Sequence, residues 1–114
     1  MYSELNIGNK TYKLRLTTKG SISLEKALGY NPITMLLAID EGKMPTLNEI
    51  LIMLHAMLQP FNHGTSMDDV YDIYDELVAE GKTMFDLIPV FVEVFQNCGY
   101  IAKNADPQVA EEKN

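Results

Sequence analysis

The segment Pro45–Pro60, PTLNEILIMLHAMLQP, decides the fold of this chain. Nine of the twelve residues of Leu47–Leu58 are apolar. Thr46 and Glu49 have the spacing of a capping box, in which the two side chains satisfy free N–H groups at the start of a helix. Pro60 cannot continue that helix, because it lacks an N–H donor and its ring clashes with the preceding turn. A helix with so little polar surface needs neighbours on several sides, so we expect the other segments to cover it.

Residues 2–16 predict a β-hairpin in front of this helix. Apolar residues alternate with polar ones on both sides of Gly8-Asn9, which is expected to supply the positive-φ residues of a tight turn. The apolar positions are Leu5, Ile7, Tyr12, Leu14 and Leu16. Two strands alone are marginally stable, so their apolar face is expected to rest on the helices.

Four further helices are expected at about residues 21–28, 32–41, 67–80 and 84–97, with Asn31, Ser66 and Thr83 as N-caps for the last three. The second presents the apolar residues Ile33, Leu36 and Leu37, and Pro89 is expected to kink or weaken one turn of the last helix. The sequence thus predicts a mainly α fold, with an N-terminal β-hairpin (2–16) followed by a compact bundle of four or five helices (21–98). These form a single domain over residues 1–101, and residues 102–114 are expected to be a flexible tail.

The net charge of −7 is unevenly distributed along the 114 residues. Residues 1–26 carry five basic and two acidic side chains, and the remainder carries four basic and fourteen acidic ones. An acidic body repels phosphate backbones, so nucleic-acid binding is not expected. The asymmetry could favour head-to-tail contact between copies, or it could simply keep the protein soluble. No apolar run reaches the roughly 20 residues of a membrane helix and no signal segment is visible, so a soluble cytoplasmic protein is expected.

No residue pattern indicates catalysis, and neither a cofactor nor a metal is expected. His55 and His63 lack the spacing of a zinc motif. Asp68 and Asp72 could share a cation with His63, but a solvated acidic helix face is the simpler interpretation. Cys98 lies near a helix C-terminus, where the helix dipole raises the pKa of a thiol, so an inert packing cysteine is expected.

The segment Met84–Phe95 is a second stretch that is apolar nearly all round. A chain of this size encloses one such helix comfortably, whereas enclosing two leaves little to form the surface. We therefore expect the second helix to keep an apolar face for another copy or a client, unless the hairpin and the short helices cover both. The candidate partner-binding residues are Phe85, Ile88, Phe91, Val92 and Phe95. Replacing Phe91 or Phe95 with Asp is predicted to weaken self-association or client binding, unless these residues belong to the core.

Two motifs carry a resemblance to a known family. The hairpin IGNKTYKLRL (Ile7–Leu16) and the helix end LEKALGYNP (Leu24–Pro32) resemble those of the tail assembly chaperones of long-tailed, siphophage-type bacteriophages and of prophages of Gram-positive bacteria. The resemblance implies a non-enzymatic protein of the host cytoplasm that binds the helical tape measure protein. It also implies help in recruiting the tail tube protein, homo-oligomer formation and absence from the mature virion.

Two alternatives remain open at this stage. The chain could be a small acidic protein-interaction adaptor or nucleic-acid mimic, whose acidic stripe occupies a basic surface on the partner. That stripe comprises Asp68, Asp72, Asp75 and Glu76. The chain could also be an enzyme of unrecognised type that uses His63 with Asp68. Charge reversal of the stripe would separate an acidic mimic from a hydrophobic chaperone.

Overall fold

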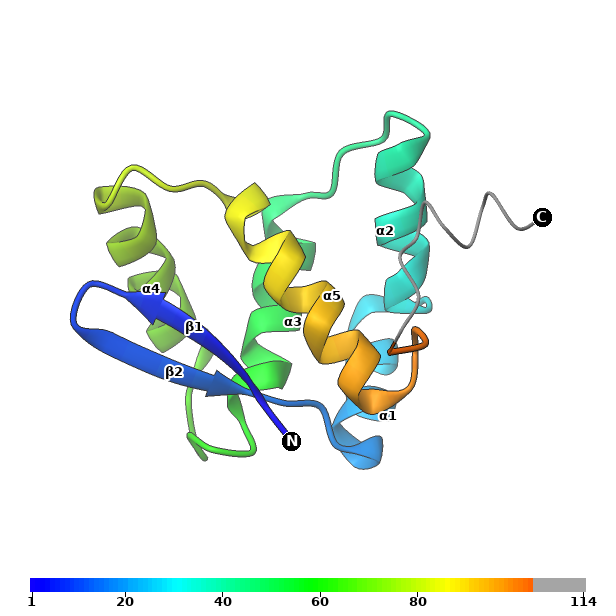
Figure 1. The fold of residues 1–114 in the computed structure, drawn as a ribbon, viewed down its shortest axis with the longest axis horizontal. Helices are drawn as coiled ribbons and strands as arrows, with labels where there is room; N and C mark the ends of the chain where they lie inside the picture. Colours follow the sequence, from blue (N-terminus) through cyan, green and yellow to red (C-terminus); the bar gives the residue numbers. More distant parts are fainter. Residues whose placement is uncertain (104–114) are drawn as a thin grey trace.

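A computed structural model describes residues 1–103 of the chain. It is mainly helical with a two-stranded antiparallel hairpin at the N-terminus, as the sequence predicts (Figure 1). The elements are β1 (Ser3–Ile7), β2 (Lys10–Leu14), α1 (Thr18–Leu28), α2 (Pro32–Asp40), α3 (Leu47–Leu58), α4 (Met67–Ala79), the 3₁₀ turn η1 (Met84–Leu87) and α5 (Ile88–Cys98). The predicted tail of residues 102–114 falls, from residue 104 onward, outside the described residues.

The hairpin pairs Ser3 with Leu14 and Leu5 with Tyr12, so its alternating apolar side chains share one face. Only Gly8 of the turn has a positive φ, at 60°. This corrects the expectation for Gly8-Asn9, because a type II′ turn needs a positive φ at its first central residue alone. The face turned inward contributes Leu5, Ile7, Leu14 and Leu16 to the core.

The central helix α3 is confirmed in position and in its start signal. The Thr46 hydroxyl accepts a hydrogen bond from the Glu49 N–H at 3.1 Å, and the Glu49 carboxylate accepts one from the Thr46 N–H at 2.7 Å. These bonds satisfy donors that have no partner within the helix. The helix packs against α1, α4 and β2. Its buried side chains are Ile50, Leu51, Met53, Leu54, Met57 and Leu58.

Two expectations for the preceding helices are wrong in detail. Helix α1 begins at Thr18 rather than near residue 21, because the Thr17 hydroxyl caps it by accepting from the Gly20 N–H at 3.0 Å. Helix α2 buries Pro32 and Met35. Of its three predicted apolar residues, Ile33 and Leu36 are partly buried against the core, whereas Leu37 is 55% exposed. The N-cap of α2 at Asn31 is as predicted. The earlier start of α1 places one further turn of helix beside α3.

The last predicted helix is divided into two parts. Thr83 and Asp86 form the expected capping box, but they cap the 3₁₀ turn η1. Helix α5 then starts afresh at Ile88, so Pro89 lies in its first turn rather than inside it. A proline is tolerated there because the N–H groups of a first turn have no helical partner to lose. The predicted kink is therefore replaced by a change of helix type.

The hairpin is attached to helices on both sides. Ser3, which is buried, donates a hydrogen bond from its Oγ to Glu93 Oε1 on α5 at 2.8 Å. Beyond β2, the Arg15 N–H donates to the Met57 carbonyl at the end of α3 at 2.9 Å. Figure 1 shows the hairpin lying across the lower left of the molecule, between α4 and α5. It thus acts as the cover for both apolar helices.

Candidate binding groove

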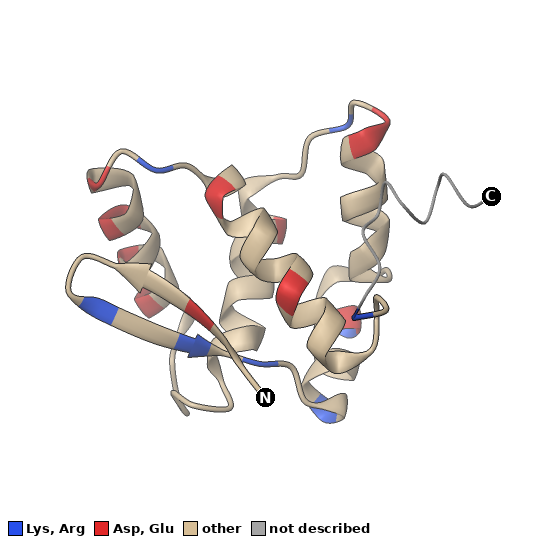
Figure 2. Ribbon diagram, viewed as in Figure 1, with Lys and Arg blue, Asp and Glu red and all other residues tan. Residues whose placement is uncertain are grey.

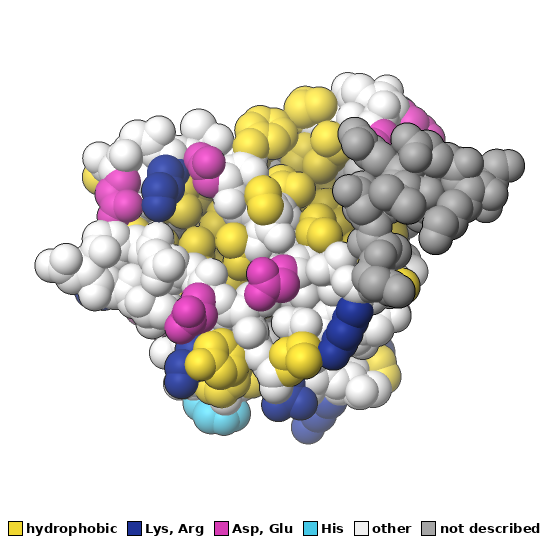
Figure 3. All heavy atoms as spheres, viewed as in Figure 1, with side chains coloured by type: hydrophobic (Ala, Val, Ile, Leu, Met, Phe, Trp, Pro, Cys, Tyr) yellow, Lys and Arg dark blue, Asp and Glu magenta, His cyan; other side chains and the backbone are white. Residues whose placement is uncertain are grey.

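The structure separates the five residues predicted to bind a partner into two groups. Phe91 and Phe95 are fully buried, so they belong to the core and cannot touch a partner from their present positions. Phe85 is 45% exposed, and Ile88 and Val92 are half-buried. Figure 3 shows hydrophobic side chains gathered over η1 and the start of α5. This surface keeps Phe85, Ile88 and Val92 as candidates for partner binding.

A second apolar surface lies between α1 and α3, where the structure has a groove of about 510 Å³. We call it the α1–α3 groove. Its lining is predominantly apolar, and the buried Leu24 is part of it. The lining residues are Thr17, Lys19, Gly20, Ser23, Leu24, Ala27, Ile52, His55, Ala56, Gln59, Pro60 and His63.

The groove exists because the residues that α1 turns toward it are small. Gly20, Ser23 and Ala27 are spaced three and four residues apart, so they share one face of α1. Ala56 is the small residue on the α3 side. Small side chains on facing helices leave space that larger ones would fill. The contact between α1 and α3 is therefore incomplete on its outer side.

The electrostatic character of the groove is opposite to that of the whole chain. None of its lining residues is acidic, although the chain has sixteen Asp and Glu residues. Its ionisable side chains are Lys19, His55 and His63. Gln59 fixes the adjoining loop, because its Nε2 donates to the His55 carbonyl at 3.1 Å and to the Thr65 carbonyl at 2.9 Å. The groove is thus largely apolar, and Lys19 is the one lining residue that carries a formal charge.

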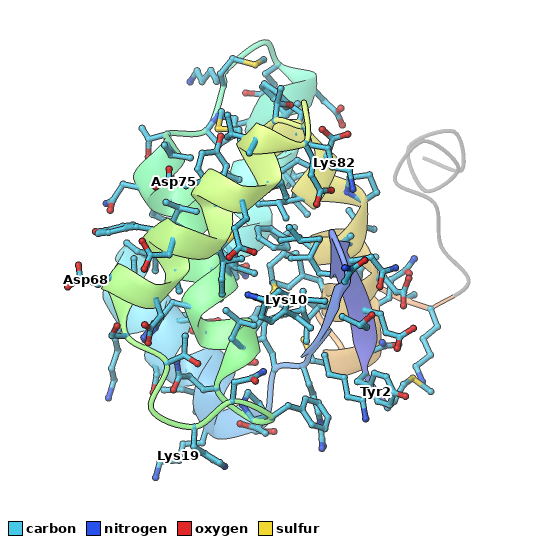
Figure 4. The ribbon with its side chains drawn as sticks, turned by 90° about the vertical axis from the view of Figure 1, so that its left-hand side faces the viewer. Tyr2, Lys10, Lys19, Asp68, Asp75 and Lys82 are labelled. Carbon is cyan, nitrogen blue, oxygen red and sulfur yellow. The ribbon has the colours of Figure 1, made fainter. Side chains whose placement is uncertain are left out.

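An acidic surface lies along α4, on another side of the molecule. Figure 2 shows Asp and Glu along α4 at the left, and Lys and Arg along the lower edge from β2 to the start of α1. Asp68, Asp72, Asp75 and Glu76 are all exposed, as the predicted acidic stripe requires. Glu76 is within 3.4 Å of Lys10 of the hairpin. In Figure 4, Asp68 and Asp75 lie on the flank of α4 away from Lys10.

The remaining candidates for chemistry have ordinary structural surroundings. Burial raises the pKa of the half-buried Cys98 thiol, in the direction the sequence predicts, although the dominant cause is burial. In residues 1–103, no group of three or more His, Cys, Asp or Glu side chains is placed to hold a metal ion. Over the same residues, no helix has the length and apolar character needed to cross a membrane.

Fold and groove define a small, mainly helical protein with an N-terminal hairpin and an open apolar groove. The chain belongs to a family of unknown function, DUF6096, whose model matches residues 3–112. Neither the curated proteins nor the solved structures contain a match to this chain.

The sequence patterns do not reveal the α1–α3 groove. His55 lies in a helix and His63 in a loop, and no spacing relates them, whereas the structure places both in the lining of the groove. One signal for the groove was present in the sequence, namely the small residues Gly20, Ser23 and Ala27 at helical spacing. The spacing is incomplete for a helix that begins near residue 21, because Gly20 then lies outside the helix.

Proposed function

We propose that this protein is a non-enzymatic phage tail assembly chaperone. It binds an apolar helical segment of the tape measure protein in the host cytoplasm, assists assembly of the tail tube protein, and is absent from the mature virion. The observation that carries the proposal is the α1–α3 groove, open and largely apolar. The resemblance of Ile7–Leu16 and Leu24–Pro32 to such chaperones supports it.

The groove suits a client that must later be released. An amphipathic helix inserts its apolar side chains into a groove of this kind and leaves its polar face in water. A groove of about 510 Å³ accepts only a few side chains, so the contact is expected to be transient. The net charge of −7 opposes aggregation of the chaperone with its bound client.

The first test uses a helical segment of the tape measure protein from the same genome. Light scattering measures its aggregation alone and with this protein. We expect the parent chain to suppress aggregation, and Ser23→Trp to lose most of that effect because the indole fills the groove. Ile22→Trp is the matched control, since Ile22 neighbours Ser23 on α1, is 51% exposed and does not line the groove.

The outcomes of this test separate the two apolar surfaces. Loss of suppression with Phe85→Asp but not with Ser23→Trp would move the client site to the surface of Phe85, Ile88 and Val92. Equal suppression by all variants, or a genome without a tape measure gene, would contradict the proposal.

A second candidate function is a small acidic adaptor or nucleic-acid mimic. The exposure of the whole stripe on α4 favours it, because Asp68, Asp72, Asp75 and Glu76 are all accessible to a basic surface. Reversing Asp72 and Asp75 to Lys should abolish binding of a basic partner. The same variant should leave capture of an apolar helix in the α1–α3 groove intact.

A further inference from the structure

We propose that the depression between α3 and α4 binds an arginine side chain of another protein, presented by a basic helix that lies along α4. We call this depression the α3–α4 pocket. It lies at the N-terminal turns of α3, whereas the α1–α3 groove extends toward the C-terminal end of the same helix. The inference is therefore independent of the chaperone proposal. It also goes beyond the adaptor hypothesis, which treats the acidic stripe as one surface and assigns neither a pocket nor a ligand side chain.

The α3–α4 pocket combines apolar, aromatic and acidic side chains in a volume of about 360 Å³. Leu51 is buried and Tyr71 is 47% exposed, so the pocket extends from the core to solvent. Helices α3 and α4 contribute three lining residues each. They are Leu47, Asn48 and Leu51 from α3, and Tyr71, Tyr74 and Asp75 from α4.

The polar groups of the pocket are not used by the fold. None of the four polar side chains that line it forms a hydrogen bond or an ion pair within residues 1–103. The depression on the hairpin side of α4 differs in this respect. There, Asp69 accepts a hydrogen bond from the Ser66 N–H at 2.9 Å, and Glu76 pairs with Lys10. The α3–α4 pocket therefore keeps its carboxylate, hydroxyl and amide groups free for a ligand.

An arginine side chain matches this combination of groups. The Asp75 carboxylate can accept paired hydrogen bonds from a guanidinium. The faces of tyrosine rings attract the same planar cation, and an apolar residue such as Leu47 accommodates its methylene stem. A lysine ammonium is a compact, strongly hydrated charge that neither stacks on a ring nor forms the paired hydrogen bonds. The pocket should therefore prefer arginine to lysine.

The spacing of two carboxylates on α4 indicates that the arginine belongs to a helix. Asp68 and Asp75 are seven residues apart, which corresponds to about 10.5 Å along the helix axis. Figure 4 shows both on the flank of α4 away from Lys10. A helix with arginines seven residues apart on one face presents them at the same interval. The only arginine of this chain is Arg15, so the pair must come from another protein, whose approach the net charge of −7 favours.

An NMR titration of the ¹⁵N-labelled full chain with a helical peptide tests the proposal. The peptide is alanine-based and carries two arginines seven residues apart, with a leucine between them. Two further peptides carry lysine or the uncharged citrulline at both positions. We expect the arginine peptide to shift the resonances of Asn48, Tyr71 and Asp75. The lysine peptide should bind about fivefold more weakly, and the citrulline peptide should not bind measurably.

Variants on two sides of α4 separate the pocket from the acidic stripe as a whole. Asp75→Asn should weaken binding of the arginine peptide by about tenfold, and Tyr71→Ala by about fivefold. Tyr71→Phe keeps the ring and should restore most of the affinity. Asp72→Asn removes the same charge on the hairpin side of α4 and should change the affinity much less. All three positions are exposed, so the fold should persist, which circular dichroism verifies.

Several results would overturn the proposal. Equal losses with Asp72→Asn and Asp75→Asn would assign the binding to the whole acidic stripe, as the adaptor hypothesis predicts. Absence of binding, or equal affinity for the arginine and lysine peptides, would contradict a guanidinium site. A peptide that binds no more tightly than N-acetylarginine amide would contradict a helical partner. The α1–α3 groove is tested separately by the aggregation assay, so either proposal can fail without the other.

Discussion

Helices α3 and α5 are alike in composition and differ in how they are covered. Both are apolar along most of their length. Helix α3 packs against α1, α4 and β2, whereas α5 packs against β1 and η1. Even so, the groove lies beside α3, the helix with more neighbours. The number of neighbours therefore does not decide where apolar surface stays open.

The size of the facing side chains explains the difference. Against α3, helix α1 presents Gly20, Ser23 and Ala27, which cannot fill the space beside Ile52 and Ala56. Against α5, the hairpin presents the buried Leu5 and Ile7, and Phe91 and Phe95 are fully enclosed. A binding groove on a helical protein is thus set by the small residues of the neighbouring helix as much as by the apolar residues of the helix itself.

The largest expected effect comes from truncating the enclosed aromatic ring of α5. Phe91→Ala should lower the free energy of unfolding by about 3–5 kcal/mol, because it removes buried apolar surface and leaves a cavity. Phe85→Ala should cost no more than about 1 kcal/mol, because the Phe85 side chain is 45% exposed. Urea unfolding of both variants measures the difference. Similar losses at the two positions would mean that the α5 side of the core is not enclosed as described.

A smaller effect is expected at the start of α3. Thr46→Ala should cost about 1 kcal/mol, because it removes the hydroxyl that accepts from the Glu49 N–H. Thr46→Ser keeps the acceptor and should cost much less.

Helix α5 has no side-chain cap of its own, since Leu87 occupies its N-cap position. Leu87 is buried, so its replacement would report on core packing instead. If urea unfolding gives the same free energy of unfolding for Thr46→Ala and for the parent chain, the capping box does not stabilise the fold.

Much of the fold is predictable from the sequence because its signals are local. The alternation of apolar and polar residues on either side of Gly8 defines the hairpin. The structure also forms a capping box at each of the three pairs whose spacing indicates one, namely Thr46/Glu49, Ser66/Asp69 and Thr83/Asp86. Each of these depends on residues three positions apart or on a single turn. The start of α1 was misplaced because Thr17 caps a helix that contains Gly20, a residue unfavourable within helices.

The candidate site was less predictable because it depends on contacts between distant segments. The apolar character of Met84–Phe95 indicates burial or binding equally well, and only the packing against the hairpin assigns Phe91 and Phe95 to the core. The α1–α3 groove needs α1 and α3 to lie side by side, which no spacing within either segment specifies. Local patterns predict helices, but the voids between helices follow from their tertiary arrangement.

The smallest expected effect is a dependence on high pH at the C-terminal end of α5. Tyr100 follows α5 and donates a hydrogen bond from its hydroxyl to Glu25 Oε2 on α1 at 2.6 Å, while its ring meets that of Phe95 edge-on. Burial, and then the Glu25 carboxylate, raise the pKa of Tyr100 from 10.0 to about 12. The folded chain therefore holds this proton more tightly than the unfolded chain does.

The contribution of Tyr100 to stability is accordingly complete below pH 10 and is lost as the pH rises toward 12. Urea unfolding at intervals from pH 9 upward should show a steeper decline for the parent than for Tyr100→Phe, which has no phenolic proton to lose. The lysines titrate in this range in both proteins, so the difference between the two curves isolates the tyrosine. If the two curves fall in parallel, the hydroxyl makes no pH-dependent contribution.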